Sequence, residues 1–224
     1  SPKFRIISQF FIVLIFLLLN KALIISDVRI DFLNNYLEIE LISIFFTVFC
    51  LLILINGSNF LDGLNTLVIG YYFLVLTTIV IVSIQFNLNI NPNVCYLIIF
   101  LSIILLLNFF NKIYLGDAGS YLISFLTAYF LLDFVSNNDS ISPYFICLLL
   151  WYPAFENLFS ILRRFSLKKK VDQADQGHLH QMIYTKFKAI SFINKKYLNT
   201  FTGMLINFFN FIVFLLSYKY YSLT

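Results

Sequence analysis

Acidic, amide and imidazole side chains gather in three short segments of an otherwise apolar chain. The first segment runs Asn56-Gly57-Ser58-Asn59-Phe60-Leu61-Asp62-Gly63-Leu64-Asn65. Asn and Asp residues followed by Gly favour turns, which present amide and carboxylate groups together. The pattern predicts a polar turn that joins two helices, and an ordinary Asn/Gly-rich turn without chemistry is the alternative reading.

The second segment runs Lys112-Ile113-Tyr114-Leu115-Gly116-Asp117-Ala118-Gly119-Ser120. Two glycines bracket Asp117 and allow the backbone to approach a ligand closely. We expect Ser120 to cap the helix that follows, and a helix N-terminus attracts phosphate. A hard cation such as Mg²⁺ would suit the carboxylate. A capped helix start with no ligand is the alternative.

The third segment is a long basic loop that also carries both histidines of the chain. Its charged and polar residues are Glu156, Arg163, Arg164, Lys168, Lys169, Lys170, Asp172, Asp175, His178, His180 and Gln181. A zinc site needs more nitrogen and sulfur ligands close together, so contact with phosphate or substrate is favoured over metal ligation. The three consecutive lysines can equally be a topology signal or a contact with anionic lipid.

The composition shows what kind of chain carries these segments. Of its 224 residues, 60% are hydrophobic and only 12% are charged. An average globular chain has about 25% charged residues, so this chain has too few to cover a soluble domain. A soluble globular enzyme, a disulfide-stapled module and a disordered chain are excluded. The three cysteines each lie in an apolar run and are expected to be small buried residues.

Seven apolar stretches approach the ~20 residues that a helix needs to cross a bilayer. They are Phe4–Ile25, Leu41–Ile55, Thr66–Phe86, Asn93–Phe110, Tyr121–Val135, Pro143–Leu162 and Phe201–Tyr218. The alternation typical of membrane strands is missing, so helices are the expected spanning structure. The sequence therefore predicts an all-α, polytopic membrane bundle of about seven transmembrane helices, in a single integral membrane domain over residues 1–224.

The charged residues predict the orientation of this bundle. If alternate loops share a side, twelve of the fifteen Lys and Arg residues fall on one side, and only Lys21, Arg29 and Lys219 fall on the other. The positive-inside rule makes the first side cytoplasmic. All three polar segments belong to that side, so we expect the chemistry to face the cytoplasm.

Taken together, the three segments resemble those of the polyprenyl-phosphate N-acetylhexosamine-1-phosphate transferases, glycosyltransferase family 4. These membrane enzymes include phospho-N-acetylmuramoyl-pentapeptide transferase and undecaprenyl-phosphate N-acetylglucosamine-1-phosphate transferase. The residues that match are Asn56, Asn59, Phe60, Asp62, Gly63, Leu115, Gly116, Asp117, Gly119, Ser120, Asp175, His178 and His180. Spans and segments follow the order of the family, so the resemblance covers essentially the whole chain.

The resemblance implies a reaction and its partners. The reaction is transfer of N-acetylhexosamine-1-phosphate from a UDP-sugar to undecaprenyl or another polyprenyl phosphate, with release of UMP, in the synthesis of cell-envelope polysaccharide such as O-antigen. The implied cofactor is Mg²⁺. The implied partners are UDP-N-acetylhexosamine, polyprenyl phosphate and the lipid bilayer of a bacterial inner membrane. A homodimer is left open, and no nucleic-acid partner is expected.

The resemblance also implies roles for particular residues. Asp62 and Asp117 would be catalytic, and Asn59 and Asp117 would hold the metal. The implied substrate-binding residues are Asn56, Asn65, Arg164, Asp175, His178 and His180.

Three departures from the family pattern qualify this reading. Asn65 stands where many members have a second Asp, and Gln181 replaces a further His; both changes are similar to the O-antigen and N-acetylglucosamine or N-acetylfucosamine branch. The family also carries an Asp-Asp pair shortly before a Ser-Pro-Lys-x-Arg segment, whereas this chain opens at Ser1-Pro2-Lys3-Phe4-Arg5. We therefore expect that pair and earlier helices to precede residue 1, and residues 1–224 alone to be inactive.

Two other classes of function stay open at this point. A secondary transporter also places acids and broken helices near cavities, although its polar sites lie near the middle of the membrane. A catalytically dead membrane remnant of a transferase is the other alternative.

Overall fold

The structure, a computed structural model, describes residues 2–166, 177–190 and 195–222, and within these ranges every regular element is a helix. The elements are α1 (Pro2–Leu19), η1 (Lys21–Leu23), α2 (Asp31–Leu37), α3 (Glu40–Leu61), α4 (Leu67–Phe86), α5 (Asn93–Phe109), α6 (Gly116–Ser136), α7 (Pro143–Leu149), α8 (Trp151–Ser166), α9 (Leu179–Ile190) and α10 (Lys195–Tyr218). The all-α class predicted from the sequence is confirmed.

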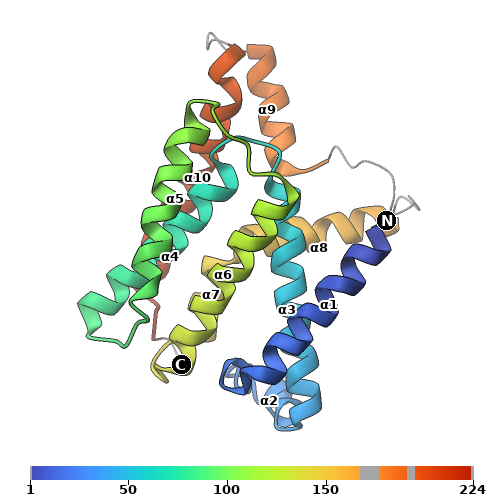
Figure 1. Cartoon of the computed structure of the whole chain (residues 1–224), viewed down its shortest axis with the longest axis vertical. Helices are drawn as coiled ribbons and strands as arrows, with labels where there is room; N and C mark the ends of the chain where they lie inside the picture. Colours follow the sequence, from blue (N-terminus) through green and yellow to red (C-terminus); the bar gives the residue numbers. More distant parts are fainter. Residues whose placement is uncertain (1, 167–176, 191–194, 223–224) are drawn as a thin grey trace.

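The long helices run up and down, so that the polar segments meet at one end of the bundle. The 62–66 loop, the 110–115 loop and α9 lie toward the upper end in Figure 1, and the start of α1 is the upper end of that helix, near the end of α8; we call this the motif end. The loops at 24–30, 87–92 and 137–142 lie at the opposite end. This arrangement supports the assumption that alternate loops share a side.

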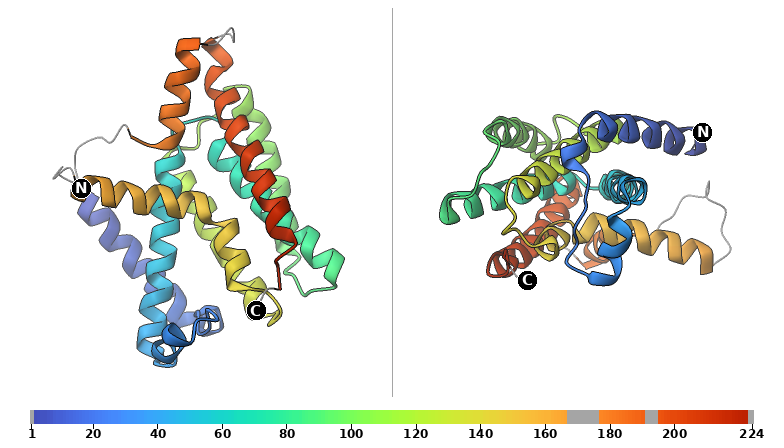
Figure 2. Two further views of the ribbon diagram at one scale, coloured as in Figure 1. Left: turned by 180° about the vertical axis from the view of Figure 1, so that it is seen from behind. Right: turned by 90° about the horizontal axis from the view of Figure 1, so that it is seen from below.

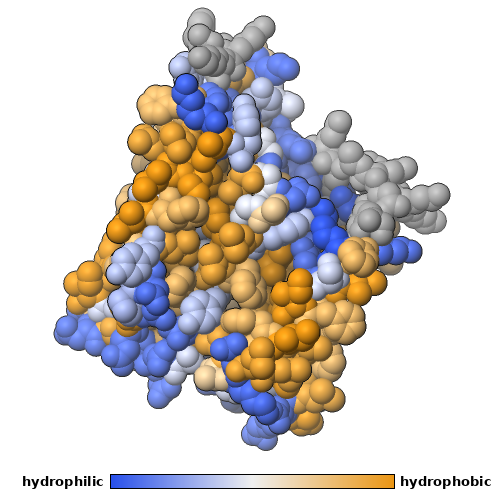
Figure 3. Space-filling model, viewed as in Figure 1, coloured by the Kyte–Doolittle hydropathy of each residue, from blue (hydrophilic) through white to orange (hydrophobic). Residues whose placement is uncertain are grey.

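The number of membrane-spanning helices predicted from the sequence is only partly supported by the described residues. Among the described residues, four helices are long and apolar enough to cross a bilayer: Glu40–Leu61, Leu67–Phe86, Gly116–Ser136 and Tyr197–Tyr218. The bent pair α7 and α8 gives a fifth if it is one span, and α5 is apolar but shorter. Four or five spans are thus supported, and the predicted number of about seven is not confirmed. Figure 3 shows apolar residues over most of one face, with hydrophilic residues toward its ends.

The predicted span Pro143–Leu162 is broken by a sharp bend. Helices α7 and α8 meet at an angle of 73° around Leu150. Pro153 stands in the first turn of α8, where its ring and its missing N–H oppose a continuous helix through Leu149 and Leu150. The bend turns α8 across the bundle, so that it passes beside α3 (Figure 2).

Helix α3 is longer than predicted, because the first half of the first polar segment is helical. The helix continues through Asn56, Gly57, Ser58 and Asn59 and ends at Leu61, where a turn was expected. A Cβ atom on Gly57 would collide with the backbone carbonyl of Pro153. Close packing of α3 on α8 therefore explains why this Gly lies in a helix despite its low helix propensity.

Helix α6 begins earlier than predicted, at Gly116, and its start takes in Asp117. Ser120 is therefore not the N-cap that we expected. Its hydroxyl donates to the carbonyl oxygen of Asp117 three residues earlier, within the helix. Gly116 has a φ of +67°, a conformation that glycine adopts without strain and that turns the chain into the helix. Asp117 thereby lies in the first turn of α6.

Candidate functional site

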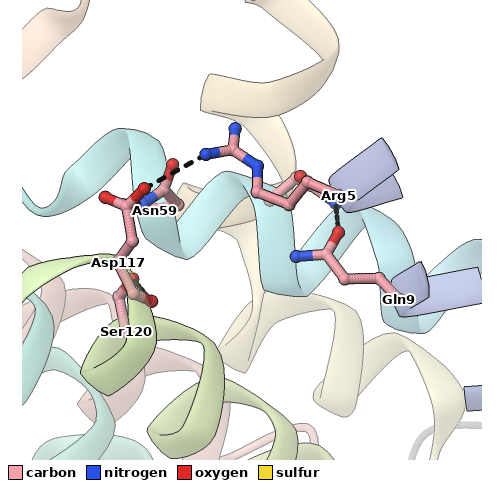
Figure 4. Close-up of polar contacts among 6 residues, drawn as sticks. Arg5, Gln9, Asn59, Asp117 and Ser120 are labelled. Atoms are coloured by element: carbon pink, nitrogen blue, oxygen red, sulfur yellow. Dashed lines mark hydrogen bonds and ion pairs between the residues drawn. The ribbon is translucent and has the colours of Figure 1, made fainter. Parts of the chain in front are cut away.

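Asp117 is the centre of a small polar cluster at the motif end. Asn59, in the last turn of α3, donates from Nδ2 to Oδ1 of Asp117 across 2.9 Å. Arg5 of α1 reaches the other oxygen, with 3.1 Å between Nη1 and Oδ2. Both side chains point toward Asp117 in Figure 4. The side chain of Asp117 is 66% exposed, so it remains open to a ligand.

Asp62 follows α3 directly and lies close to the same cluster. Burial raises the pKa of its carboxyl to about 6, and the negative charge of Asp117 adds to this rise, while a hydrogen bond from the backbone amide of Gly116 opposes it. Two carboxyl groups that repel each other, beside an amide side chain, form a donor set of hard oxygen atoms. Such a set suits a divalent cation that also takes oxygen ligands from phosphate.

Asn56 joins two helices beneath this cluster. Its amide nitrogen donates to Oε1 of Gln9 on α1 over 3.0 Å, and to the carbonyl oxygen of Leu52 one turn earlier in α3 over 2.9 Å. The helix that carries Arg5 is thereby fixed to the helix that carries Asn59. Asn56 was predicted to bind substrate, but its side chain faces α1 in this structure. Its observed contact with Gln9 joins α1 to α3.

A network of asparagine side chains holds the 62–66 loop in place. The backbone N–H of Asn65 donates to Oδ1 of Asn199, and its side chain donates to Oδ1 of Asn111. The next residue, Thr66, has a φ of +67° and donates its backbone N–H to Oδ1 of Asn108. These bonds to α5, α10 and the 110–115 loop offset the strain of a left-handed, β-branched residue. Asn65 is 7% exposed, so in this structure its amide is engaged inside the protein.

A second cluster, next to the first, is built around the buried carboxylate of Glu156 on α8. Glu156 Oε2 lies 2.9 Å from Nδ1 of His178, and Oε1 accepts the backbone N–H of Leu179 at 2.8 Å. The ring of His178 stacks on that of Phe60, with 5.2 Å between ring centroids. The guanidinium of Arg164 lies 5.7 Å above the centre of Phe60 on α3. Phe60 thus connects the histidine segment to α3.

His180 is buried more completely than His178, with 0% of its surface exposed against 4%. It is fully buried, both ring nitrogens have no hydrogen-bond partner, and its ring stacks on that of His178. A Cβ atom on Gly63 would come within 2.7 Å of its Nε2 atom. Burial lowers the pKa of His180 to about 4; Glu156 opposes this change and His178 adds to it. A neutral imidazole therefore packs directly against the turn that follows Asp62.

The structure brings most of the predicted site residues together at the motif end. Asn59, Asp62 and Asp117 form one cluster, and Arg164, His178 and His180 surround Phe60 and Gly63 beside it. Asn56 and Asn65 face neighbouring helices and loops. Asp175 lies outside the described residues. Within the described part of the chain, no three His, Cys, Asp or Glu side chains converge as metal ligands.

Two residues of the site were given no role by the sequence analysis. Arg5 pairs with Asp117, although 112 positions separate them in the chain. Glu156 binds the segment that carries His178. The signal for Glu156 was an acidic residue within an apolar stretch, because such residues are rare and often functional. Which partner it binds depends on the bend between α7 and α8, and the sequence did not predict that bend.

Comparisons with known proteins are consistent with this site. The family described as glycosyl transferase family 4 matches residues 1–135, which contain Arg5 and the first two polar segments. A Bacillus subtilis (strain 168) protein named "Probable undecaprenyl-phosphate N-acetylglucosaminyl 1-phosphate transferase" is 26% identical over 196 residues, which cover 82% of this chain. The chain spans about half, 51%, of the length of that relative.

Proposed function

Because the chain belongs to glycosyl transferase family 4, we propose that it takes part in transfer of an N-acetylhexosamine-1-phosphate from a UDP-sugar to a membrane-bound polyprenyl phosphate. The protein that contains this chain would release UMP and leave a lipid-linked sugar diphosphate. The name of the Bacillus subtilis relative supports a polyprenyl-phosphate acceptor and an N-acetylglucosaminyl donor group. Synthesis of cell-envelope polysaccharide at a bacterial inner membrane, with the motif end in the cytoplasm, belongs to the same proposal.

The observation that carries the proposal is the cluster at Asp117. Residues from α1, α3 and α6 meet there, although Arg5, Asn59 and Asp117 are far apart in sequence. Phosphoryl transfer depends mainly on positioning of the reactants and on electrostatic stabilisation. A cluster of two carboxyl groups with arginine nearby, at the end of an apolar bundle, can supply both.

The donor set fits Mg²⁺. Asp117 and the oxygen of the Asn59 amide would hold the ion, and Asp62 lies close enough for the charge of Asp117 to raise its pKa. Mg²⁺ keeps few protein ligands and takes others from phosphate, so the lack of a third acidic ligand does not argue against it. When bound, the ion would neutralise phosphate charge and stabilise the charge that develops on transfer. The Asn59 amide nitrogen faces Asp117 here, so the side chain would rotate to present its oxygen.

The chain's own residues then have separate tasks in the reaction. An oxygen of the lipid phosphate forms a bond to the sugar-bearing phosphorus of the donor, and the bond between that phosphorus and UMP breaks. Asp62 would orient the donor or accept a proton during this step. His178 and Arg164 would contact the phosphates, since both lie on Phe60 at the edge of the cluster. Direct contact between His180 and substrate would require its buried segment to open.

An apolar cavity within the bundle, between the level of the 24–30 loop and Leu54, suits the acceptor's hydrocarbon chain. It has a volume of about 260 Å³ and lies between α3, α6, α7 and α8. Its lining includes Leu54, which lies between one and two turns before Asn59 on α3. A polyprenyl chain in this cavity would bring its phosphate toward the motif end. A site at the end of the bundle also favours a transferase over a transporter, whose sites lie near mid-membrane.

The test is release of UMP by the full-length protein that contains this chain, in detergent, with UDP-N-acetylglucosamine, polyprenyl phosphate and Mg²⁺. We expect UMP release that requires all three, and a lipid product that carries the sugar. Other UDP-N-acetylhexosamines, added singly, would define the donor. UMP release that is independent of the polyprenyl phosphate, or none with any donor, would refute the proposal.

A further inference from the structure

Glu156 has an unusual position for an acidic residue. It lies on α8 beside the apolar bundle, and only 1% of its surface is exposed. Each of its two oxygens has a partner from the same segment: Oε2 binds Nδ1 of His178, and Oε1 accepts the N–H of Leu179. A buried carboxylate is costly unless it is paired and hydrogen-bonded. Glu156 therefore holds residues 178–179 against α8 at two points.

This double contact fixes the orientation of the His178 ring. Nδ1 must point at α8, and a nitrogen that faces a carboxylate carries its proton there. Nε2, on the other side of the ring, points away from Glu156. The ring, which is 4% exposed, also stacks on Phe60, at 5.2 Å, and on His180, at 5.6 Å between centroids. Its freedom to rotate is therefore small.

The ionisable groups around this pair favour binding of an anion. Arg163 of α8 donates to the carbonyl oxygen of Gly177, just before His178, and Arg164 of the same helix lies over Phe60. Among the described residues, Tyr152 of α8 and His180 of α9 are further titratable groups near Glu156. The carboxylate thus orients a histidine in an environment that contains two arginines.

We propose that Glu156 is a positioning residue for the nucleoside diphosphate of the donor: it fixes His178 so that Nε2 of the imidazolium form, with Nδ1–H held by Glu156, can donate to a phosphate oxygen. This inference rests on the proposed function, because it takes a UDP-sugar as the ligand. Glu156 itself does not touch the substrate. The ring that it holds is fixed before the ligand arrives, so binding costs less side-chain entropy.

A binding experiment with the protein in detergent tests this role without turnover. UDP and uridine are titrated calorimetrically into the parent protein, Glu156→Gln, Glu156→Asp and the control Glu38→Gln, an exposed acid at the opposite end. We expect Glu156→Gln to weaken UDP binding about tenfold, as loss of a charge-assisted hydrogen bond would. Uridine binding and the control should be unchanged, and Glu156→Asp should retain most of the affinity.

Kinetics distinguish positioning from a general structural role. In the transfer assay, Glu156→Gln should raise KM for the UDP-sugar and leave KM for the polyprenyl phosphate unchanged. When His178→Gln is added to Glu156→Gln, KM for the UDP-sugar should not rise further, because both substitutions remove the same contact. Equal UDP affinity of the parent and Glu156→Gln would overturn the inference, whereas absence of UDP binding by the parent would overturn the proposed function itself.

A spectroscopic readout keeps the inference testable if Glu156→Gln does not fold. Residues 1–224 contain two histidines, so in ¹⁵N-histidine NMR the two signals that change in His178→Gln and in His180→Phe identify their rings. In the parent protein with UDP bound, we expect both nitrogens of His178 to carry protons. A His178 ring without a proton on Nε2 in that complex would contradict the proposal.

Discussion

Asn59 donates a hydrogen bond to Asp117, and this contact joins the end of α3 to the beginning of α6. The distance between Nδ2 and Oδ1 is 2.9 Å, although 58 residues separate the two positions. The first and second polar segments therefore form a single site. Arg5 completes it from α1, so three helices must hold their positions for the cluster to exist.

Substitution of Asp117 tests the assignment of this cluster to Mg²⁺. We predict that Asp117→Asn abolishes Mg²⁺-dependent transfer and leaves membrane insertion intact, because Asn removes the charge but keeps the size of the side chain. UMP release is measured across a Mg²⁺ titration, with insertion followed by membrane fractionation. Asp139→Asn, an exposed acid at the opposite end, is the matched control and should behave like the parent. Equal activity of Asp117→Asn and parent at every Mg²⁺ concentration would disprove the metal assignment.

The distribution of basic residues leads to a prediction about topology. We expect a cysteine at Lys186, exposed on α9, to react with a membrane-impermeant maleimide only from the cytoplasmic side. A cysteine at Asp31, exposed at the start of α2, should react only from outside. The three cysteines of the chain are first replaced by Ala, since Cys95 and Cys147 are exposed and Cys50 is half-buried, whereas the sequence predicted that all three are buried. Labelling of both positions from the same side would contradict the orientation and the place of the site.

Helix type, order and several boundaries follow from the sequence because they depend on local hydrophobicity. The stretches Thr66–Phe86 and Asn93–Phe110 coincide with α4 and α5 to within one residue at each end. The errors lie where tertiary contacts outweigh local preference. Gly57 remains helical because α3 packs on Pro153, and the bend at Leu150 depends on Pro153 in a stretch that was expected to be a single span.

The candidate site was predictable in its residue types and only partly in its contacts. Asn59, Asp62 and Asp117 are recognisable from their segments, since an amide and two acids beside glycines form an uncommon pattern. The pairing of Arg5 with Asp117 and of Glu156 with His178 could not be deduced. Both pairs join residues from different helices, and their formation depends on how those helices cross.

The buried imidazole of His180 predicts a pH dependence of stability. Burial lowers its pKa from an ordinary value of 6.5 to about 4. Between pH 6.5 and pH 4 the unfolded chain binds a proton at His180 that the folded chain does not bind. The contribution of neutral His180 to the free energy of unfolding is therefore complete above pH 6.5 and is lost as the pH falls toward 4. The loss is at most about 1.4 kcal/mol per pH unit. Thermal unfolding in detergent from pH 7 to 4.5 should show a smaller decrease for His180→Phe than for the parent. Parallel curves would rule out this contribution.

The contact between Gly63 and His180 predicts that the loss of stability caused by Gly63→Ala depends on whether His180 is present. In Gly63→Ala the new methyl group would lie 2.7 Å from Nε2 of a ring that cannot easily move, since it stacks on His178. Overpacking of this kind costs about 1–3 kcal/mol. We expect Gly63→Ala to lower the unfolding temperature and UDP affinity in the parent, and to cost less in a His180→Ala background. The double-mutant cycle measures this coupling. Gly57→Ala is the control, because it collides with the backbone of Pro153, and His180→Ala should not reduce its cost. If Gly63→Ala costs the same in both backgrounds, His180 does not determine the position of the turn after Asp62.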